Sequence, residues 1–233
     1  MTGYLVRRIL QMIVALLGVS IIVFALLHLV PGDPVRVALG TRFAPDLCAM
    51  LRALGGLERP SFVQYFSWLG NALTGDLGLS FRNSQPVTTL VMERLPATIT
   101  LAFAALFVAL LVALPAGIIS AVRSGKALDY GVSAASQVGI SMPDFWAGVM
   151  YILLFSLTLS WLPSSGYVSF SESPVDWLRH LILPAITVGL ISGSIITRFV
   201  RSAVLEALNQ DYVRTARAKG LSEWKIVRRH VLP

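Results

Sequence analysis

The strongest constraint on the fold is an uninterrupted apolar stretch near the start of the chain. Residues Ile9 to Val30 contain no Asp, Glu, Lys or Arg. At about 1.5 Å per helical residue they can cross the roughly 30 Å hydrocarbon core of a bilayer. A cleaved signal peptide has a shorter apolar core of about 7–15 residues and small residues at its cleavage site, whereas Pro-Gly-Asp-Pro follows here. We therefore expect a retained transmembrane helix, with Arg7 and Arg8 holding its start in the cytoplasm.

Three more apolar segments follow, at 97–122, 130–162 and 181–199. The middle one is longer than a straight crossing needs and is interrupted by Pro143 and Asp144, so it is either one kinked helix or two half-helices. The chain is 55% hydrophobic and 13% charged, whereas soluble domains carry about 25% charged residues. The sequence thus predicts an all-α fold, a polytopic transmembrane helical bundle with about four spans.

Small residues mark one face of the last apolar segment. Gly189 and Gly193 lie four residues apart, a spacing that lets the backbones of neighbouring membrane helices approach closely. We expect a helix–helix packing face there.

The distribution of Lys and Arg predicts the orientation, because short basic loops stay in the cytoplasm. The 123–129 linker and the 198–233 tail are both basic, so we expect both chain ends inside and the 31–96 and 163–180 segments outside. The net charge of +7 is then explained by cytoplasmic loops, and we expect no nucleic-acid partner. The predicted organisation has three parts: an anchor and first helix at 1–30, an extracytoplasmic segment at 31–96, and core spans at 97–233 with a cytoplasmic loop at 211–233.

An amphipathic helix is predicted inside the extracytoplasmic segment. Pro60 suits the start of a helix and Gly75 its end. Between them, apolar side chains recur at helical spacing at Phe62, Tyr65, Phe66, Leu69 and Leu73. Such a stripe either packs on the protein or lies at the membrane surface, and we favour packing.

Ionisable residues inside a membrane are expensive to bury and mark functional sites. Asp144 is the one carboxylate within a predicted span. With Ser141 and Pro143 it either lines a translocation path or caps a helix that restarts after Pro143. A proton relay needs a chain of such groups, so a proton-driven transporter is disfavoured.

Metal and disulfide chemistry have little support. The chain has one cysteine, Cys48, and three histidines, His28, His180 and His230, far apart in sequence. We interpret the histidines as structural or interfacial and expect no metal, no cofactor and no catalytic site of an intramembrane enzyme.

The tail predicts two short helices around one glycine. Asp211 is placed to cap the first helix and Ser222 the second, while Gly220 suits the left-handed residue that ends a helix. The expected apolar face comprises Tyr212, Val213, Ala216, Leu221, Trp224, and Ile226 or Val227. Attraction to anionic lipid explains the charge of this segment. A docking elbow for a cytoplasmic partner also explains the glycine, the caps and an exposed tryptophan.

This segment resembles the coupling loop of ABC importer permeases, which reads Glu-Ala-Ala, three residues, Gly, nine residues, Ile-x-Leu-Pro. Here Arg214-Thr215-Ala216, Gly220 and His230-Val231-Leu232-Pro233 stand at those spacings, with Arg, Thr and His in place of Glu, Ala and Ile. The form DYVRTARAKGL is similar to that of the dipeptide, oligopeptide and nickel permeases. Further matches to that family are LVPGDPV at 29–35, GDLGLSFRNSQPV at 75–87, RLPATITLA at 94–102, SMPDFW at 141–146, WLPSSG at 161–166 and LILPAITVG at 181–189.

The resemblance implies one half of a heterodimeric pore in the bacterial inner membrane, importing di- or oligopeptides, or else nickel or another small solute. It implies a second permease subunit, a periplasmic or lipid-anchored substrate-binding protein, and two cytoplasmic ATPase subunits that carry the ATP chemistry. The expected ATPase-docking residues are Arg214, Thr215, Ala216, Arg217, Lys219, Gly220, Leu221, Trp224, Leu232 and Pro233. A stand-alone channel or secondary transporter is the competing class.

The resemblance also predicts six spans, the last two after the coupling loop. This sequence stops at Pro233, so we expect a truncated reading frame or a fragment.

Overall fold

The computed structural model describes residues 2–29, 59–80 and 85–231, and within them the backbone is helical apart from connecting turns and one antiparallel bridge between Leu79 and Pro86. The chain divides into two compact units, Met1–Leu95 and Pro96–Pro233. The all-α prediction is confirmed. Cys48 and nearly all of the 29–35 motif lie outside the described residues.

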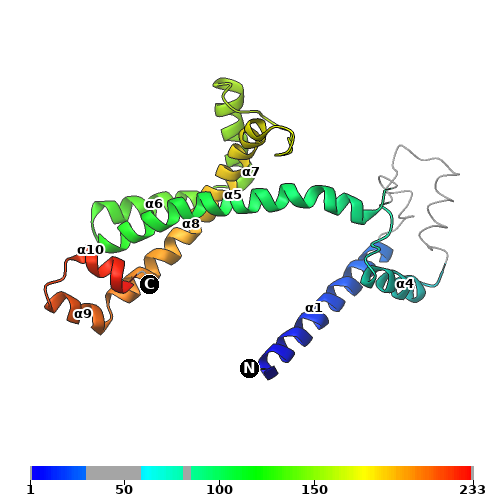
Figure 1. Ribbon diagram of the computed structural model, residues 1–233, viewed down its shortest axis with the longest axis horizontal. Coiled ribbons are helices and arrows are strands. Elements are labelled where there is room, and N and C mark those ends of the chain that lie inside the picture. The colour runs from blue at the N-terminus through cyan, green and yellow to red at the C-terminus, as the bar shows by residue number, and fades with distance from the viewer. Residues whose placement is uncertain (1, 30–58, 81–84, 232–233) are drawn as a thin grey trace. The chain divides into compact units, whose positions relative to one another are not determined.

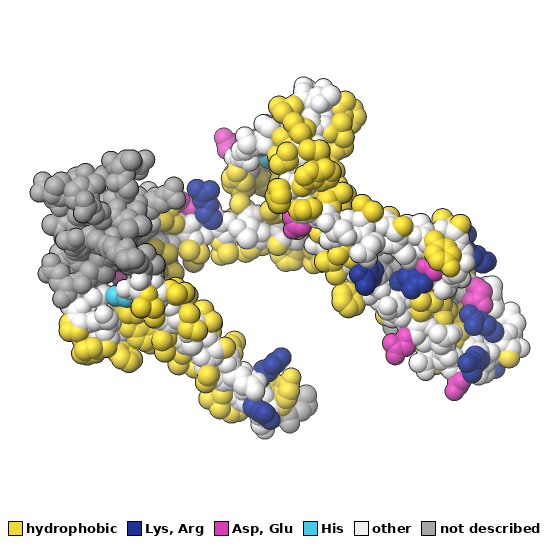
Figure 2. All heavy atoms as spheres, turned by 180° about the vertical axis from the view of Figure 1, so that it is seen from behind, with side chains coloured by type: hydrophobic (Ala, Val, Ile, Leu, Met, Phe, Trp, Pro, Cys, Tyr) yellow, Lys and Arg dark blue, Asp and Glu magenta, His cyan; other side chains and the backbone are white. Residues whose placement is uncertain are grey.

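The first unit contains a long apolar helix, α1 (Thr2–Leu29). It contains the predicted first span as far as Leu29 and begins before Arg7 and Arg8; Val30 lies outside the described residues. Its apolar side chains are exposed around most of its circumference, and Figure 2 shows those on one face. A helix that is apolar all round and unburied by its own chain is suited to lipid or to a neighbouring protein.

The predicted amphipathic helix is present as α4 (Ser61–Leu73), with Pro60 before it and Gly75 in a left-handed conformation after it. Tyr65 is buried; its ring packs edge-on against Phe24 of α1 and its hydroxyl lies 2.8 Å from the hydroxyl of Ser20. The expected packing is thus confirmed at Tyr65. It is wrong for three of the other stripe residues, which are exposed: Phe62, Phe66 and Leu73.

A single helix, α5 (Val87–Val122), runs through the boundary between the units. It begins ten residues before the predicted span and continues through Pro96, although a proline inside a helix removes one backbone hydrogen bond and crowds the preceding turn. The second unit adds α6 (Ala127–Ser141), α7 (Asp144–Tyr151), the π-helix η2 (Ile152–Thr158) and α8 (Pro174–Leu208), followed by α9 (Asp211–Ala218), α10 (Glu223–Ile226) and the π-turn η3 (Val227–Val231) (Figure 1).

The start of α8 differs from the prediction of a loop as far as residue 180. Ser173 accepts a hydrogen bond from the Asp176 amide, and Pro174 occupies the first helical position, where its missing N–H is not needed. The helix therefore starts seven residues before the apolar segment. It also continues past Phe199 to Leu208, carrying Arg201 on its extension.

The segment at 130–162 is two helices, which resolves the alternative left open by the sequence. α6 ends at Ser141, and the axis turns by 99° before the second helix runs from Asp144 to Thr158. Met142 is extended, as expected of a residue before proline. Three helices among the described residues are long and apolar enough to cross a membrane, and this bent pair makes a fourth crossing if it counts as one span.

α5 and α8 pack through small residues, as Gly189 and Gly193 predict. A Cβ at Gly189 would lie 2.7 Å from the Val108 Cβ, and one at Gly193 would lie 3.2 Å from the Ala109 carbonyl oxygen. Small side chains recur every four residues on the facing stripe of α5, at Ala105, Ala109, Ala113, Gly117 and Ala121. The close approach of these backbones forms the core of the second unit.

Candidate coupling site and translocation groove

The elbow comprises residues 211–231 and turns at Gly220. Gly220 has φ +78° and donates its N–H to the Arg217 carbonyl at 2.9 Å, while Leu221 donates to the Ala216 carbonyl at 3.3 Å. These two bonds form the Schellman motif, which satisfies the last carbonyls of α9 and needs a residue that tolerates positive φ. The predicted helix–glycine–helix is confirmed.

One face of the elbow is buried against the membrane helices. Val213, Ile226 and Val227 are fully shielded and Ala216 nearly so. They join a cluster contributed by α5 and α8 whose buried members are Ala121, Val204 and Leu208. The elbow is thus attached by apolar packing to the last turns of both helices (Figure 1). A displacement of the elbow would have to disturb this packing or carry the helix ends along.

Several details of the predicted elbow are wrong. Gln210 precedes α9, and Asp211 is its first residue rather than its cap; Asp211 pairs instead with Arg214 at 3.5 Å. Ser222 stands before α10 with the extended backbone of a cap but makes no side-chain cap bond. Tyr212 and Trp224 are exposed and so do not belong to the apolar face, whereas Val213 and Ile226 do; the expectation of an exposed tryptophan is confirmed.

The exposed face of the elbow is cationic and aromatic. Six predicted docking residues are exposed on it: Arg214, Thr215, Arg217, Lys219, Gly220 and Trp224. Ala216 is buried and Leu221 partly buried in the cluster shared with α5 and α8, so neither is part of the exposed face; Leu232 and Pro233 lie outside the described residues. Figure 2 shows Lys and Arg side chains gathered on this end of the second unit.

An ion pair bridges the two arms of the elbow across Gly220. Arg217 Nε donates to Glu223 Oε1 at 2.7 Å, and its terminal nitrogen donates to Oε2 at 3.1 Å. This two-point hydrogen bond lowers the pKa of the Glu223 carboxyl and raises the pKa of the Arg217 guanidinium. Both groups are about half exposed, so the pair fixes geometry more than it stabilises the fold.

A buried polar cluster next to the elbow is not anticipated by the sequence. It joins Asp129 at the start of α6 to Ser120 of α5 and Arg201 of α8. In the sequence, Asp129 belongs to a basic linker and Arg201 to a cationic tail, and each resembles an ordinary surface charge. One acidic residue in an otherwise basic linker is the available sequence signal, and it does not identify Arg201 as the partner.

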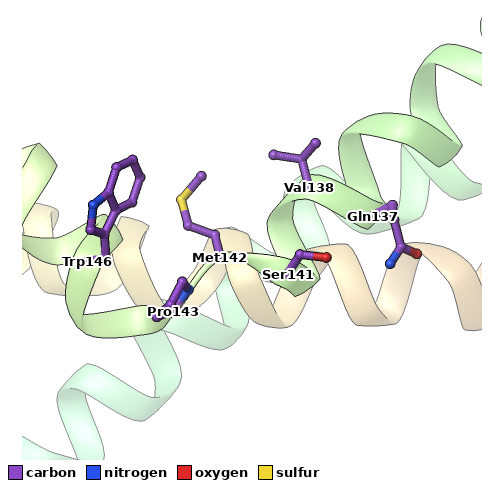
Figure 3. Close-up of a pocket in the computed structure, with 6 residues that line it drawn as sticks. All are labelled: Gln137, Val138, Ser141, Met142, Pro143 and Trp146. Carbon is purple, nitrogen blue, oxygen red and sulfur yellow. The ribbon is translucent and has the colours of Figure 1, made fainter.

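The predicted path residues are only partly brought together. Ser141 and Pro143 line an open, mostly apolar groove of about 450 Å³ at the break between α6 and α7. The groove lining also includes Gln137, Val138, Met142 and Trp146. In Figure 3 the side chains of Val138, Met142 and Trp146 stand on the same side of the break.

Asp144 is not among the lining residues; it is exposed as the first residue of α7. Pro143 occupies the cap position of α7 and no side chain makes a cap hydrogen bond there, so the alternative that Asp144 caps this helix is wrong. A carboxylate in the first turn still complements the positive end of the helix dipole.

The histidines that the structure describes have local contacts. The ring nitrogens of His28 lie 2.9 Å from the Phe24 carbonyl oxygen and 3.2 Å from Gln64 Oε1, while His180 Nδ1 lies 2.7 Å from the Asp176 carbonyl oxygen. In the described ranges no three His, Cys, Asp or Glu side chains come together as metal ligands.

Comparison with known proteins agrees with this architecture. Residues 113–233 match the family described as binding-protein-dependent transport system inner membrane component, and residues 1–102 match the N-terminal region of such membrane components. A putative peptide transport system permease protein of Brucella suis is 41% identical over 230 residues, covering 99% of this chain and 73% of the relative. The oligopeptide transport system permease protein AppB of Bacillus subtilis is 37% identical over 235 residues, with coverage of 100% and 74%. The di/tripeptide transport system permease protein DppB of Pseudomonas aeruginosa is 40% identical over 253 residues, with coverage of 100% and 75%. The chain belongs to the binding-protein-dependent transport system inner membrane components, as a permease subunit.

Proposed function

We propose that this permease subunit imports di- or oligopeptides across the bacterial inner membrane and is driven by ATPase subunits that dock on its elbow. The observation that carries the proposal is the two-sided elbow, which is buried on α5 and α8 by one face and presents arginine, lysine and tryptophan on the other. Peptide as the solute is supported by the names of the relatives from Brucella, Bacillus and Pseudomonas.

The proposed assembly contains a second permease subunit, two cytoplasmic ATPase subunits that hydrolyse the ATP, and a substrate-binding protein outside the membrane. The exposed cationic face of the elbow is suited to the ATPase surface because charged rims steer association and an aromatic side chain supplies an anchor. The 31–96 segment and the 163–173 loop are assigned to the outer side, where the binding protein delivers solute.

The path of the bent helix pair supports four crossings with both termini in the cytoplasm. Asp129 contacts Arg201, a Cβ at Gly139 would meet Ser194, and further along a Cβ at Gly148 would lie 3.5 Å from the Thr187 methyl group. Successive contacts of α6 and α7 therefore fall progressively earlier along α8, from Arg201 to Thr187, which are fourteen residue steps or about 21 Å of helix. This course supports a broken crossing, and the proposal counts the bent pair as one span.

The groove at the α6–α7 break is proposed to form part of the solute path. A sharp break at membrane depth is stable where the freed backbone lines a cavity or is covered by protein. Ser141, with Gln137, offers polar groups beside an apolar wall that includes Trp146. Asp144 lies one residue beyond Pro143 and would meet solute at the mouth of the groove.

Docking is tested by co-purification from detergent-solubilised membranes that contain the complete transporter. Replacing Arg214 and Lys219 with Glu reverses the charge of the exposed elbow face without touching its buried face, and we expect loss of the ATPase subunits. Arg179→Glu, a single charge reversal at the opposite end of α8, is the control and should retain them. Undiminished recovery of ATPase with the elbow variant would refute the docking assignment.

The solute is tested by uptake into cells that lack their other peptide importers. We expect this transporter to restore ATP-dependent uptake of radiolabelled trialanine and to leave uptake of radioactive nickel unchanged. Restored nickel uptake without peptide uptake would assign the alternative solute class.

A further inference from the structure

The Asp129 carboxylate is held by four hydrogen bonds from three directions. Arg201 donates Nε to Oδ1 at 2.7 Å and a terminal nitrogen to Oδ2 at 2.8 Å. The Ser120 hydroxyl donates to Oδ1 at 2.5 Å, and the Gly125 amide donates to Oδ2 at 2.9 Å. The Ser120 oxygen also accepts from Arg201 Nε at 3.1 Å. We name Ser120, Gly125, Asp129 and Arg201 the clamp.

The clamp ties together three helices at positions that are distant in the sequence. Ser120 lies in the last turn of α5, Gly125 in the turn that follows, Asp129 in the first turn of α6, and Arg201 on α8. The Ser120 and Asp129 side chains are buried, and the Arg201 side chain is 30% exposed. A planar guanidinium bound at two points to a carboxylate fixes both distance and orientation.

The clamp lies directly beside the packing of the elbow. Ala121, next to Ser120, and Val204, about one turn beyond Arg201, both belong to the cluster that buries Val213, Ile226 and Val227. The polar clamp and the apolar cluster are thus neighbours that share α5 and α8. The first joins α5, α6 and α8 to one another, and the second joins the elbow to α5 and α8.

Stability alone is a weak explanation for this arrangement. Removing two charges from water offsets much of their attraction, and well-packed apolar side chains often stabilise a fold equally well. The ion pair fixes the relative orientation of the helices, whereas an apolar replacement would not, since apolar contacts have no directional preference.

We propose that Asp129 and Arg201 are positioning residues for transport, which make the ends of α5, α6 and α8 move with the elbow as one rigid body. This inference rests on the proposed function, in which ATPase closure displaces the elbow. A push on the elbow then reaches α6, and through it the α6–α7 break that borders the groove, without being absorbed by sliding between helices. Neither residue touches solute or nucleotide in this role.

The test is a distance measurement in the complete transporter, in a Cys48→Ser background with cysteine spin labels at Lys126 and Arg228. These exposed sites lie on the α5–α6 turn and on η3. With the clamp intact we expect one narrow distance distribution, with the same peak without nucleotide and after trapping with ATP and vanadate. The double variant Asp129→Leu/Arg201→Met leaves no unpaired buried charge, and its distribution should broaden or shift by at least about 1–2 Å.

Transport per ATP hydrolysed is the second readout. It should fall by at least about fivefold in the double variant and remain unchanged in Arg198→Met, an exposed arginine one turn away on α8. Arg201→Lys keeps the charge but loses the planar fork, and should give an intermediate loss. If the double variant fails to assemble, this lysine variant carries the test.

Two results would overturn the rigid-body role. One is an unchanged narrow distribution in both clamp variants. The other is a shift of the wild-type peak on trapping, which would make the ion pair a switch that opens during the cycle. Failure of the proposed function gives a different result, because the ATPase subunits would then not co-purify with the permease. The distances measured without nucleotide in the wild type and the clamp variants would still report on the clamp.

Discussion

Gly189 of α8 lies so close to α5 that a Cβ atom would stand 2.7 Å from the Val108 Cβ and 2.9 Å from the Ala105 carbonyl oxygen. Backbone atoms of α5 give little way, so the two helices would have to separate. We expect Gly189→Ala to lower the free energy of unfolding by about 1–3 kcal/mol, measured as a reduced thermal midpoint in detergent. Gly131→Ala on α6, where nothing lies within 4 Å, is the control and should be neutral or slightly stabilising. Equal behaviour of the two variants would show that α5 and α8 are not packed at Gly189.

Gly220 is required for its backbone conformation rather than for space. Its φ is +78° and no atom lies within 4 Å of the point that a Cβ would occupy, so a side chain fits but a left-handed backbone does not suit it. We expect Gly220→Ala to destabilise the elbow by about 1–2 kcal/mol and Gly220→Asn by less, because asparagine tolerates this region. Hydrogen exchange of the 211–231 amides measures the effect. The same protection in all three proteins would contradict the Schellman motif.

The Arg217–Glu223 pair predicts a modest pH dependence of the elbow. Hydrogen bonding to Arg217 lowers the pKa of Glu223 below its ordinary value of 4.5 in the folded protein. A depressed folded-state pKa contributes stability that is fully present above the unfolded-state value and is lost as pH falls through the folded-state value. Because both groups are about half exposed, the contribution is at most about 1 kcal/mol and weakens with salt.

The variant Glu223→Gln isolates this contribution. Its elbow should be less protected against hydrogen exchange than the wild type at neutral pH, and the difference should vanish once the pH is below the lowered pKa of Glu223. Glu206→Gln, an exposed carboxamide substitution on α8, is the control. A difference that persists in acid would show that the pair is not responsible.

Periodicity and turn chemistry predict much of this structure. Continuous apolar runs predict the spans, Pro60 and Gly75 predict both ends of α4, and Gly220 predicts the elbow. These features are local, since each depends on residues within a few positions of one another. The small-residue spacing at Gly189 and Gly193 is also local and marks a packing face without identifying α5 as the partner.

What the sequence does not reveal depends on contacts between distant segments. Asp129 and Arg201 are 72 residues apart, and nothing around either one indicates that the other is its partner. Ile226 is buried and Trp224 is exposed because the ends of α5 and α8 pack against the side of the elbow that carries Ile226. Periodicity within a short helix does not determine which side that is. The 99° turn after Ser141 likewise requires α7 to pack on α8, beyond what Pro143 alone specifies.

Tyr65 attaches α4 to α1 through one hydrogen bond and one ring contact. Its hydroxyl lies 2.8 Å from that of Ser20, and its ring packs on Phe24. Tyr65→Phe keeps the ring and removes the hydroxyl, and Ser20→Ala removes the other partner. An intramolecular hydrogen bond contributes about 0.5–1.5 kcal/mol net, so we expect each single variant to loosen α4 slightly and the double variant to be no worse than the worse single. Protection of residues 61–73 against proteolysis measures this cycle, with exposed Phe62→Leu as the control. Strictly additive losses would mean that the two hydroxyls do not interact, which leaves the Phe24–Tyr65 ring contact and the His28–Gln64 hydrogen bond to hold α4 on α1.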